Sequence, residues 1–195
     1  MVRYIPDGDE RRLTTAAREL LELAMPFQDW TDEHHADTPK RFAKMLRDLT
    51  NRDAEEFKFT VFENVDHLDA MIVVEPVPFY TLCAHHVIPF FGHAYLAYIP
   101  DKSIAGLSKL ARTVTYMSKG LWAQENLTAE IADFLENELN PLGVAVVMRA
   151  EHLCMAMRGA HISGAKTTTS AMRGVFLDTT KGARSEFLDL VRNDL

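Results

Sequence analysis

Residues 78–91 read Pro78-Phe79-Tyr80-Thr81-Leu82-Cys83-Ala84-His85-His86-Val87-Ile88-Pro89-Phe90-Phe91, which places sulfur and imidazole donors between two apolar runs. The only other cysteine, Cys154, follows His152 by two residues. Thiolate and imidazole are ligands that zinc favours, so a metal site is the first hypothesis. If residues 150–157 form a strand, His152 and Cys154 point to one face and can meet the same ion. The five candidate donors, counting both His85 and His86, exceed the three or four that a tetrahedral site needs.

Two other interpretations of the cysteines stay open. Cysteines are often buried simply as small apolar residues, and a neighbouring histidine is then unremarkable. A disulfide between Cys83 and Cys154 is the second, but we see no signal peptide, and cytosolic thiols stay reduced. The C-x-H-H and H-x-C spacings favour a metal over both, although they are less regular than a zinc-finger pattern.

Composition narrows the class of protein. The chain has 195 residues, 47% of them hydrophobic and 25% charged, which suits one soluble domain with a helical extension. No apolar run approaches the roughly 20 residues of a membrane span. The net charge of −7 argues against a nucleic-acid surface. A small anionic substrate would therefore need a local basic pocket.

Periodic apolar residues predict two helices near the N-terminus. The first covers about residues 9–25. In the second, Thr38 is expected as the N-cap and Pro39 as the first helical residue. Arg41 and Lys44 are three residues apart, so they share one face of this helix.

The rest of the chain alternates groups of strands and helices. Strands are expected at 57–61, 71–74 (ended by Pro76 and Pro78), 93–99, 144–150, 151–158 and 167–176, and helices from about 106 to 117, 127 to 139 and 181 to 191. This order lacks strand-helix-strand alternation and predicts an α+β fold with an antiparallel sheet. At the start of the helix near 106, Ser108, Lys109 and Arg112 join free backbone N–H groups that can hold phosphate.

Six segments, in one unbroken order, resemble the zinc-dependent bacterial-type GTP cyclohydrolase I family. They are residues 37–41, 79–86, 106–112, 124–125, 151–155 and 166–174. The resemblance implies the tunnelling fold, in which sheets from five subunits close a barrel and two rings form a homo-decamer. Closing the barrel removes the free edges of each sheet. We expect residues 1–50 to be a helical extension and 51–195 the catalytic domain.

The resemblance also implies roles for individual residues. Three zinc ligands leave one position for water, as in a catalytic site. The implied zinc ligands are Cys83, His86 and Cys154; the catalytic residues are His85, His152, Ser108 and Gln124; the substrate-binding residues are Glu125, Arg41, Lys44, Ser108, Lys109, Arg112 and Arg158. Glu125 would accept from the guanine edge, and the basic residues would surround the triphosphate.

The implied reaction is the hydrolysis of GTP to 7,8-dihydroneopterin triphosphate and formate. His85 would protonate N7 of the guanine, and His152 would serve later proton transfers. The product would feed tetrahydrofolate or 7-deazaguanine synthesis in the cytoplasm. No nucleic acid or membrane partner is expected.

The sequence departs from the family pattern at three positions. Ala84 stands where a glutamate is usual, and Trp122 and Asn126 replace a glutamine and an arginine. These changes bear on efficiency, base binding or subunit contacts more than on the type of reaction. A nitrile reductase, a non-catalytic zinc-stabilised assembly protein and an enzyme that stops at a formamide intermediate remain alternatives. Metal analysis with formate detection separates them.

Overall fold

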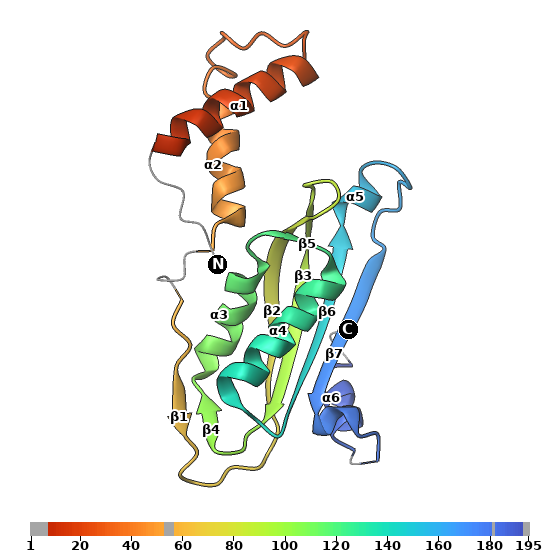
Figure 1. Ribbon diagram of the computed structural model, residues 1–195. Helices are drawn as coiled ribbons and strands as arrows, with labels where there is room; N and C mark the ends of the chain where they lie inside the picture. The colour runs from red at the N-terminus through yellow and green to blue at the C-terminus, as the bar shows by residue number, and fades with distance from the viewer. Residues whose placement is uncertain (1–7, 53–56, 181, 193–195) are drawn as a thin grey trace. The chain divides into compact units, whose positions relative to one another are not determined.

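A computed structural model describes residues 8–52, 57–180 and 182–192 (Figure 1). The chain divides into two compact units, residues 1–54 and 55–195. Each unit is described by itself.

The N-terminal unit is a pair of helices, α1 (Gly8–Ala24) and α2 (Thr38–Thr50). Ala17 and Ala43 are buried, and Arg47 forms an ion pair with Glu10 at 3.5 Å. The expected N-cap at Thr38 is wrong by one residue. The backbone N–H of Arg41 donates to the carbonyl of Asp37 (3.0 Å), so Asp37 occupies the cap position.

The second unit is built on a five-stranded sheet of order β5-β2-β3-β6-β7. Its strands are β2 (Ile72–Cys83), β3 (Pro89–Ile99), β5 (Leu121–Trp122), β6 (Gly143–His152) and β7 (Lys166–Gly174). The pairs β2–β3, β3–β6 and β6–β7 are antiparallel, and only the short β5 runs parallel to β2. The predicted α+β class with an antiparallel sheet is confirmed.

Helices cover both faces of this sheet. The helices α3 (Leu107–Ser118) and α4 (Gln124–Leu139) pack on one face, where Leu127, Ile131 and Leu135 are fully buried (Figure 1). Alternate sheet residues, such as Tyr95, face a second core that contains Phe187 of α6 (Ala183–Val191). A 3₁₀ turn, η1 (Val175–Leu177), joins β7 to that region, so β7 ends at Gly174, two residues earlier than expected.

The strand expected at residues 57–61 differs from the one observed. Residues 57–60 are not a strand; β1 is only Val61–Glu63, paired with β4 (Ser103–Ala105). The alternating aromatics pack on helices instead, since Phe57 stacks on Tyr116 with ring centroids 4.8 Å apart.

The first long strand also differs from expectation, because it continues through the prolines instead of ending at them. The register of β2 against β3 shifts between Val74 and Val77. This irregularity accommodates prolines, which cannot donate to a regular ladder.

We expect Gly92→Ala to destabilise the protein strongly. A Cβ at Gly92 would lie 1.9 Å from the carbonyl oxygen of Arg149 on the neighbouring strand, so two central strands would have to separate. Overpacking of this kind costs about 3 kcal/mol or more, which lowers the thermal midpoint by about 6 °C or more in a chain of this size. Gly106→Ala is the control, because its nearest neighbours lie at 3.6 Å. Equal midpoints for the two variants in a thermal scan would contradict the close approach.

Candidate metal centre and active site

A tight turn after β2 places two histidines beside Cys83. The N–H of Cys83 donates to the carbonyl of Ile88, and the N–H of Val87 donates back to the carbonyl of Cys83, both at 2.9 Å. Within this turn the Nδ1 atoms of His85 and His86 lie 3.7 and 3.8 Å from Cys83 Sγ. The turn therefore gathers the first donor cluster locally.

Cys154 reaches this cluster from a short helix. The expected strand over 151–158 is wrong, because β6 ends at His152 and α5 (Leu153–Ala156) follows. The N–H of Met157 donates to the carbonyl of Leu153 at 2.9 Å, which closes the turn. His152 and Cys154 therefore do not share a strand face, and the helical turn carries Cys154 to the donors.

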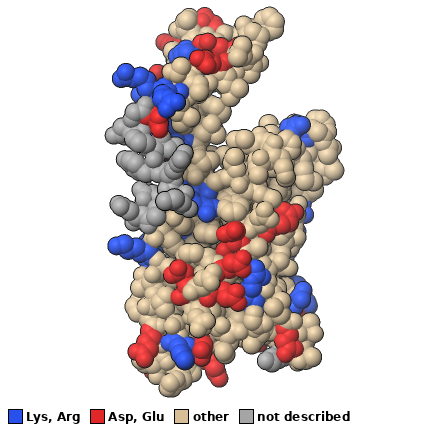
Figure 2. Space-filling model, in the orientation of Figure 1, with Lys and Arg blue, Asp and Glu red and all other residues tan. Residues whose placement is uncertain are grey.

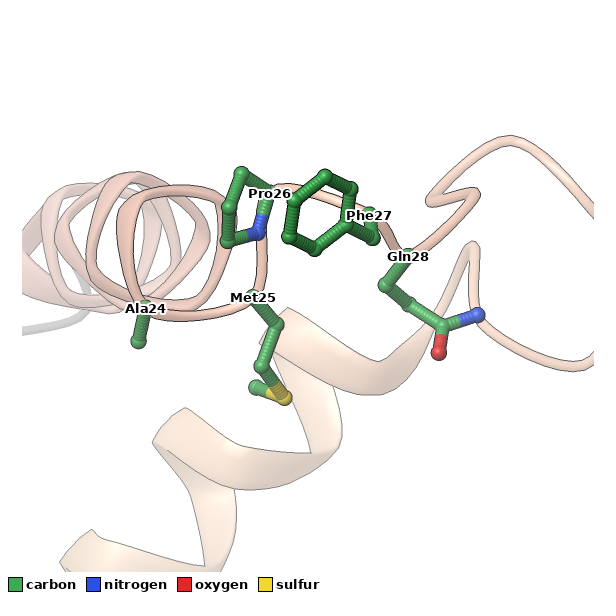
Figure 3. A pocket seen from close by; sticks show the side chains of 5 residues that line it. All are labelled: Ala24, Met25, Pro26, Phe27 and Gln28. Atoms are coloured by element: carbon green, nitrogen blue, oxygen red, sulfur yellow. The ribbon is translucent and has the colours of Figure 1, made fainter.

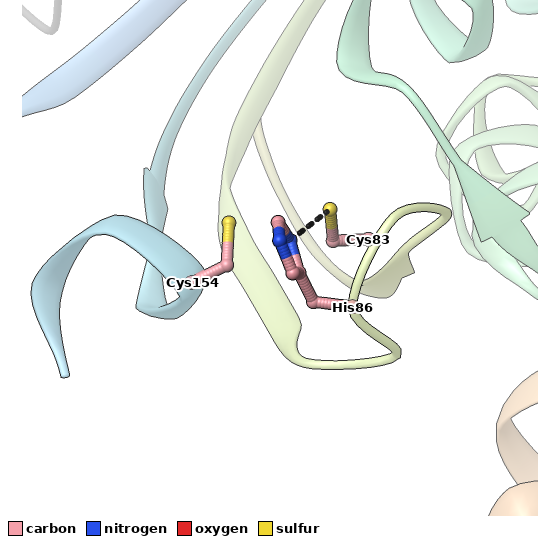
Figure 4. A group of neighbouring side chains, drawn as sticks. All are labelled: Cys83, His86 and Cys154. Carbon is pink, nitrogen blue, oxygen red and sulfur yellow. Dashed lines mark hydrogen bonds between the residues drawn. The ribbon is translucent and has the colours of Figure 1, made fainter. Parts of the chain in front are cut away.

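Cys83, His86 and Cys154 form a group that can hold a metal ion (Figure 4). Their ligand atoms all lie within 4.8 Å of one another. Tetrahedral zinc with these ligands places its donors roughly 3.5 to 3.8 Å apart. The 3.8 Å separation between Cys83 and His86 fits this range, and three protein donors leave a fourth position open.

The surroundings of Cys154 oppose ionisation of its thiol. Burial raises the pKa of the Cys154 thiol, and the nearby Cys83 raises it further. The charge of Arg158 acts in the opposite direction, which places Arg158 within electrostatic reach of the group. A bound divalent cation would instead favour the thiolate form, because thiols that coordinate a metal are deprotonated.

His152 lies behind this group and is held on two sides. Its ring stacks on Phe90 with centroids 4.4 Å apart and planes at 5°. Its Nε2 is 2.7 Å from Oε1 of Gln124. Burial lowers the pKa of His152, and the charge of Glu125 raises it, so Glu125 also lies near this ring.

Gln124, at the start of α4, is 2% exposed and has an internally bonded amide. Its Nε2 faces the carbonyls of Met148 and Thr167 (both 3.1 Å) and the hydroxyl of Thr169 (3.0 Å). Thr169 is also 2.6 Å from Thr128 Oγ1. Sequence reasoning missed both threonines. Thr128, four residues after Gln124 on the same helix face, was the available signal.

The expected phosphate-binding residues of α3 lie at its first two turns. Gly106, the N-cap, is extended, and the helix has no side-chain cap. The N–H groups of Gly106 and Lys109 donate to the carbonyls of Thr60 and Gly106, so those of Leu107 and Ser108 are the ones left at the helix start for a ligand. Ser108 and Arg112 are exposed, whereas Lys109 is half-buried. A hollow of about 250 Å³ is lined by Phe57, Arg112, Thr115, Tyr116 and Lys119.

Arg41 and Lys44 lie on α2 in the N-terminal unit. Arg41 pairs with Asp37 at 3.7 Å, and Lys44 pairs with Asp48. A hollow of about 220 Å³ is lined by Glu10, Asp37, Lys40, Arg41 and Lys44. An anionic ligand would have to compete with the carboxylates for both cations.

Another hollow in the N-terminal unit has no catalytic chemistry. It measures about 430 Å³ and is lined by Ala24, Met25, Pro26, Phe27 and Gln28 (Figure 3). None of these side chains titrates, so this hollow is not the active site.

The visible face carries both acidic and basic side chains. Asp and Glu gather over α4 in Figure 2, where Arg173 pairs with Asp133 at 2.6 Å. Among the described residues, the helices are too short or too polar to cross a bilayer.

The sheet and the donor group together define the class: an α+β protein whose Cys-His-Cys group can hold a metal ion. A family model described as GTP cyclohydrolase I matches residues 13–192. The chain belongs to this family, and its curled, helix-backed sheet is the tunnelling fold.

Relatives with this name match over nearly the whole chain. GTP cyclohydrolase 1 of Sulfurihydrogenibium sp. is 48% identical over 185 residues, covering 95% of this chain and 96% of the relative. That of Aquifex aeolicus is 47% identical, covering 94% and 97%. Among solved structures, archaeosine synthase QueF-Like in the apo form matches with a TM-score of 0.43 and 14% identity, covering 53% of this chain and 93% of its own.

We expect His86→Ala to lose the bound metal and His85→Ala to keep it. Both rings approach Cys83, but it is His86 that groups with Cys83 and Cys154 as a possible metal ligand. Elemental analysis of the purified variants gives metal per chain. Cys83→Ala and Cys154→Ala should also be empty. Retention of a full equivalent in either cysteine variant, or loss only in His85→Ala, would contradict this ligand set.

Proposed function

We propose that this protein hydrolyses GTP to 7,8-dihydroneopterin triphosphate and formate, with zinc held by Cys83, His86 and Cys154. The observation that supports this most is the three-donor group with His85 and His152 beside it, in a chain of the GTP cyclohydrolase I family. Two thiolates with one imidazole suit zinc better than the harder divalent ions. When bound, zinc supplies a Lewis acid that makes water nucleophilic near neutral pH.

The two histidines outside the ligand set are proposed as proton carriers. His85 is exposed in the turn beside Cys83, where it can reach a bound base, and we assign it to N7. His152 is half-buried and fixed by Gln124 and Phe90, and we assign it to later steps. Release of C8 as formate needs two hydrolytic steps, so two separately placed carriers suit the chemistry.

Glu125 is proposed to select guanine. It is exposed in the first turn of α4. A carboxylate accepts from adjacent N–H donors of guanine that adenine does not present in that arrangement. Its electrostatic effect on His152 supports a place near the reacting base.

The triphosphate is proposed to bind cationic and hydroxyl groups from several segments. These are Arg41, Lys44, Ser108, Lys109, Arg112 and Arg158, with Ser108 also kept as a catalytic residue. Because the chain has a net charge of −7, an anionic substrate needs a local group of cationic side chains to bind.

We propose that residues 51–195 form the catalytic domain, that 1–50 extend it, and that the cytoplasmic protein is a decamer. Within the described residues, β2 has an outer partner only at Leu82 and Cys83, and the nine-residue β7 lies at the opposite edge. Long free edges are normally covered, and closing a barrel between subunits covers both.

The activity is tested by incubating the zinc-loaded protein with GTP and measuring formate and the pterin product by chromatography. We expect equal amounts of the two, and loss of both after chelation. A nitrile reductase would instead consume a nicotinamide cofactor without releasing formate. Zinc binding without GTP turnover would contradict the proposal and favour a structural zinc protein, and accumulation of a formamide would favour a truncated reaction.

The oligomer is tested by light scattering. We expect a mass near ten times the 22.1 kDa chain. Ser170→Pro, in the middle of edge strand β7, should weaken assembly if its free backbone side pairs between subunits, because proline lacks the N–H donor. A fully active monomer would contradict the barrel.

A further inference from the structure

We propose that Thr128 and Thr169 are positioning residues that fix the amide of Gln124 and, through it, the proton-bearing nitrogen of His152. This inference rests on the proposed function, since it concerns the histidine assigned to proton transfer. Neither threonine was among the site residues expected from the sequence.

The two threonines close a ring of hydrogen bonds through both ends of Gln124. Thr128 Oγ1 donates to the backbone carbonyl of Gln124 at 2.8 Å. Thr128 and Thr169 hydroxyls are 2.6 Å apart, and Thr169 Oγ1 is 3.0 Å from Nε2 of Gln124. The ring therefore joins the main chain of Gln124 to its own side-chain nitrogen through a helix and a strand.

The direction of each bond in the ring follows from the number of protons. A hydroxyl has one proton, and that of Thr128 is used on the Gln124 carbonyl. Thr169 must then donate to Thr128, which leaves the lone pairs of Thr169 to accept from Gln124 Nε2. Because Nε2 has two protons and three acceptors, one of its N–H groups is shared between two of them. Each hydroxyl donates once and accepts once.

The same count of protons fixes the orientation of the Gln124 amide and the tautomer of His152. Nε2 of Gln124 faces two backbone carbonyls, of Met148 and Thr167, which can only accept. The amide oxygen therefore points to His152, and a bond of 2.7 Å requires a proton on His152 Nε2. In the neutral ring, Nδ1 is then the nitrogen that can take a proton.

The hydrogen-bond ring restrains the Gln124 amide more closely than the carbonyls of Met148 and Thr167 do alone. Glutamine has three rotatable side-chain bonds, and holding it in one geometry costs conformational entropy. Anchoring both ends to Thr128 and Thr169 limits the positions that Oε1 can take. Because Gln124 is buried and its amide is fully engaged, the group acts on the reaction only through His152.

The test compares Thr169→Val with Thr169→Ser in the zinc-loaded, full-length protein. Valine keeps the shape but removes the hydroxyl, whereas serine keeps the hydroxyl. We expect Thr169→Val to lower kcat about tenfold, the rate equivalent of one lost hydrogen bond, with KM for GTP within about twofold. Thr169→Ser should restore kcat to within about twofold of the wild type.

Thr113→Val is the matched control. Thr113 is fully buried, and its hydroxyl donates to a backbone carbonyl four residues earlier, outside the ring. Equal kcat values for the Thr113 and Thr169 valine variants would overturn the proposal. If Thr169→Val does not fold, Thr128→Val opens the same ring from the helix side and is judged by the same criteria.

A second readout does not depend on turnover. Solid-state NMR of protein labelled with ¹⁵N-histidine distinguishes the two neutral tautomers, and His152→Gln identifies the His152 signal. We expect protonated Nε2 in the wild type and Thr169→Ser, and a mixture in Thr169→Val. An unchanged tautomer in Thr169→Val would overturn the inference. Absence of formate from the wild type would contradict the proposed function, while the tautomer would still decide the positioning role.

Discussion

The register between β3 and β6 is the constraint on which the site depends. The ten pairs run from Phe90↔His152 to Ile99↔Gly143, so the beginning of one strand lies against the end of the other. The turn that carries Cys83 and His86 precedes β3, and the helical turn that carries Cys154 follows β6. A slip of one residue would exchange the two faces of β6 and separate the donors. The fully buried Ala94 and Val146 resist that exchange, because both belong to the larger core.

Much of this arrangement was predictable from the residues. The helices follow from apolar spacing, and the donor types at Cys83, His85, His86, His152 and Cys154 indicated a metal before any geometry was known. Only the family resemblance selected three of these five as ligands. The short helix at Cys154 was not predictable, because a four-residue turn is too short to show a helical period. The interpretation of Phe57 failed for a related reason, since alternating aromatics also suit contacts with helices.

The buried polar ring could not be predicted because it depends on tertiary contacts. Thr169 lies in a run of similar residues on β7, and only the β6–β7 register brings it toward α4. Every member of the ring is satisfied, so its burial avoids the large penalty of an unpaired polar group. Such a network favours one arrangement of helix and strands over slightly displaced ones.

The start of α4 has a consequence for discrimination between substrates. Gln124 and Glu125 are consecutive, and one is buried while the other is exposed. Both residues belong to the first turn of α4. A bound base that displaced this turn through the outward carboxylate would also shift the inward amide. Under the proposed roles, a nucleotide with the wrong base would react more slowly as well as bind more weakly. Part of the selectivity for guanine would therefore lie in the rate of the reaction.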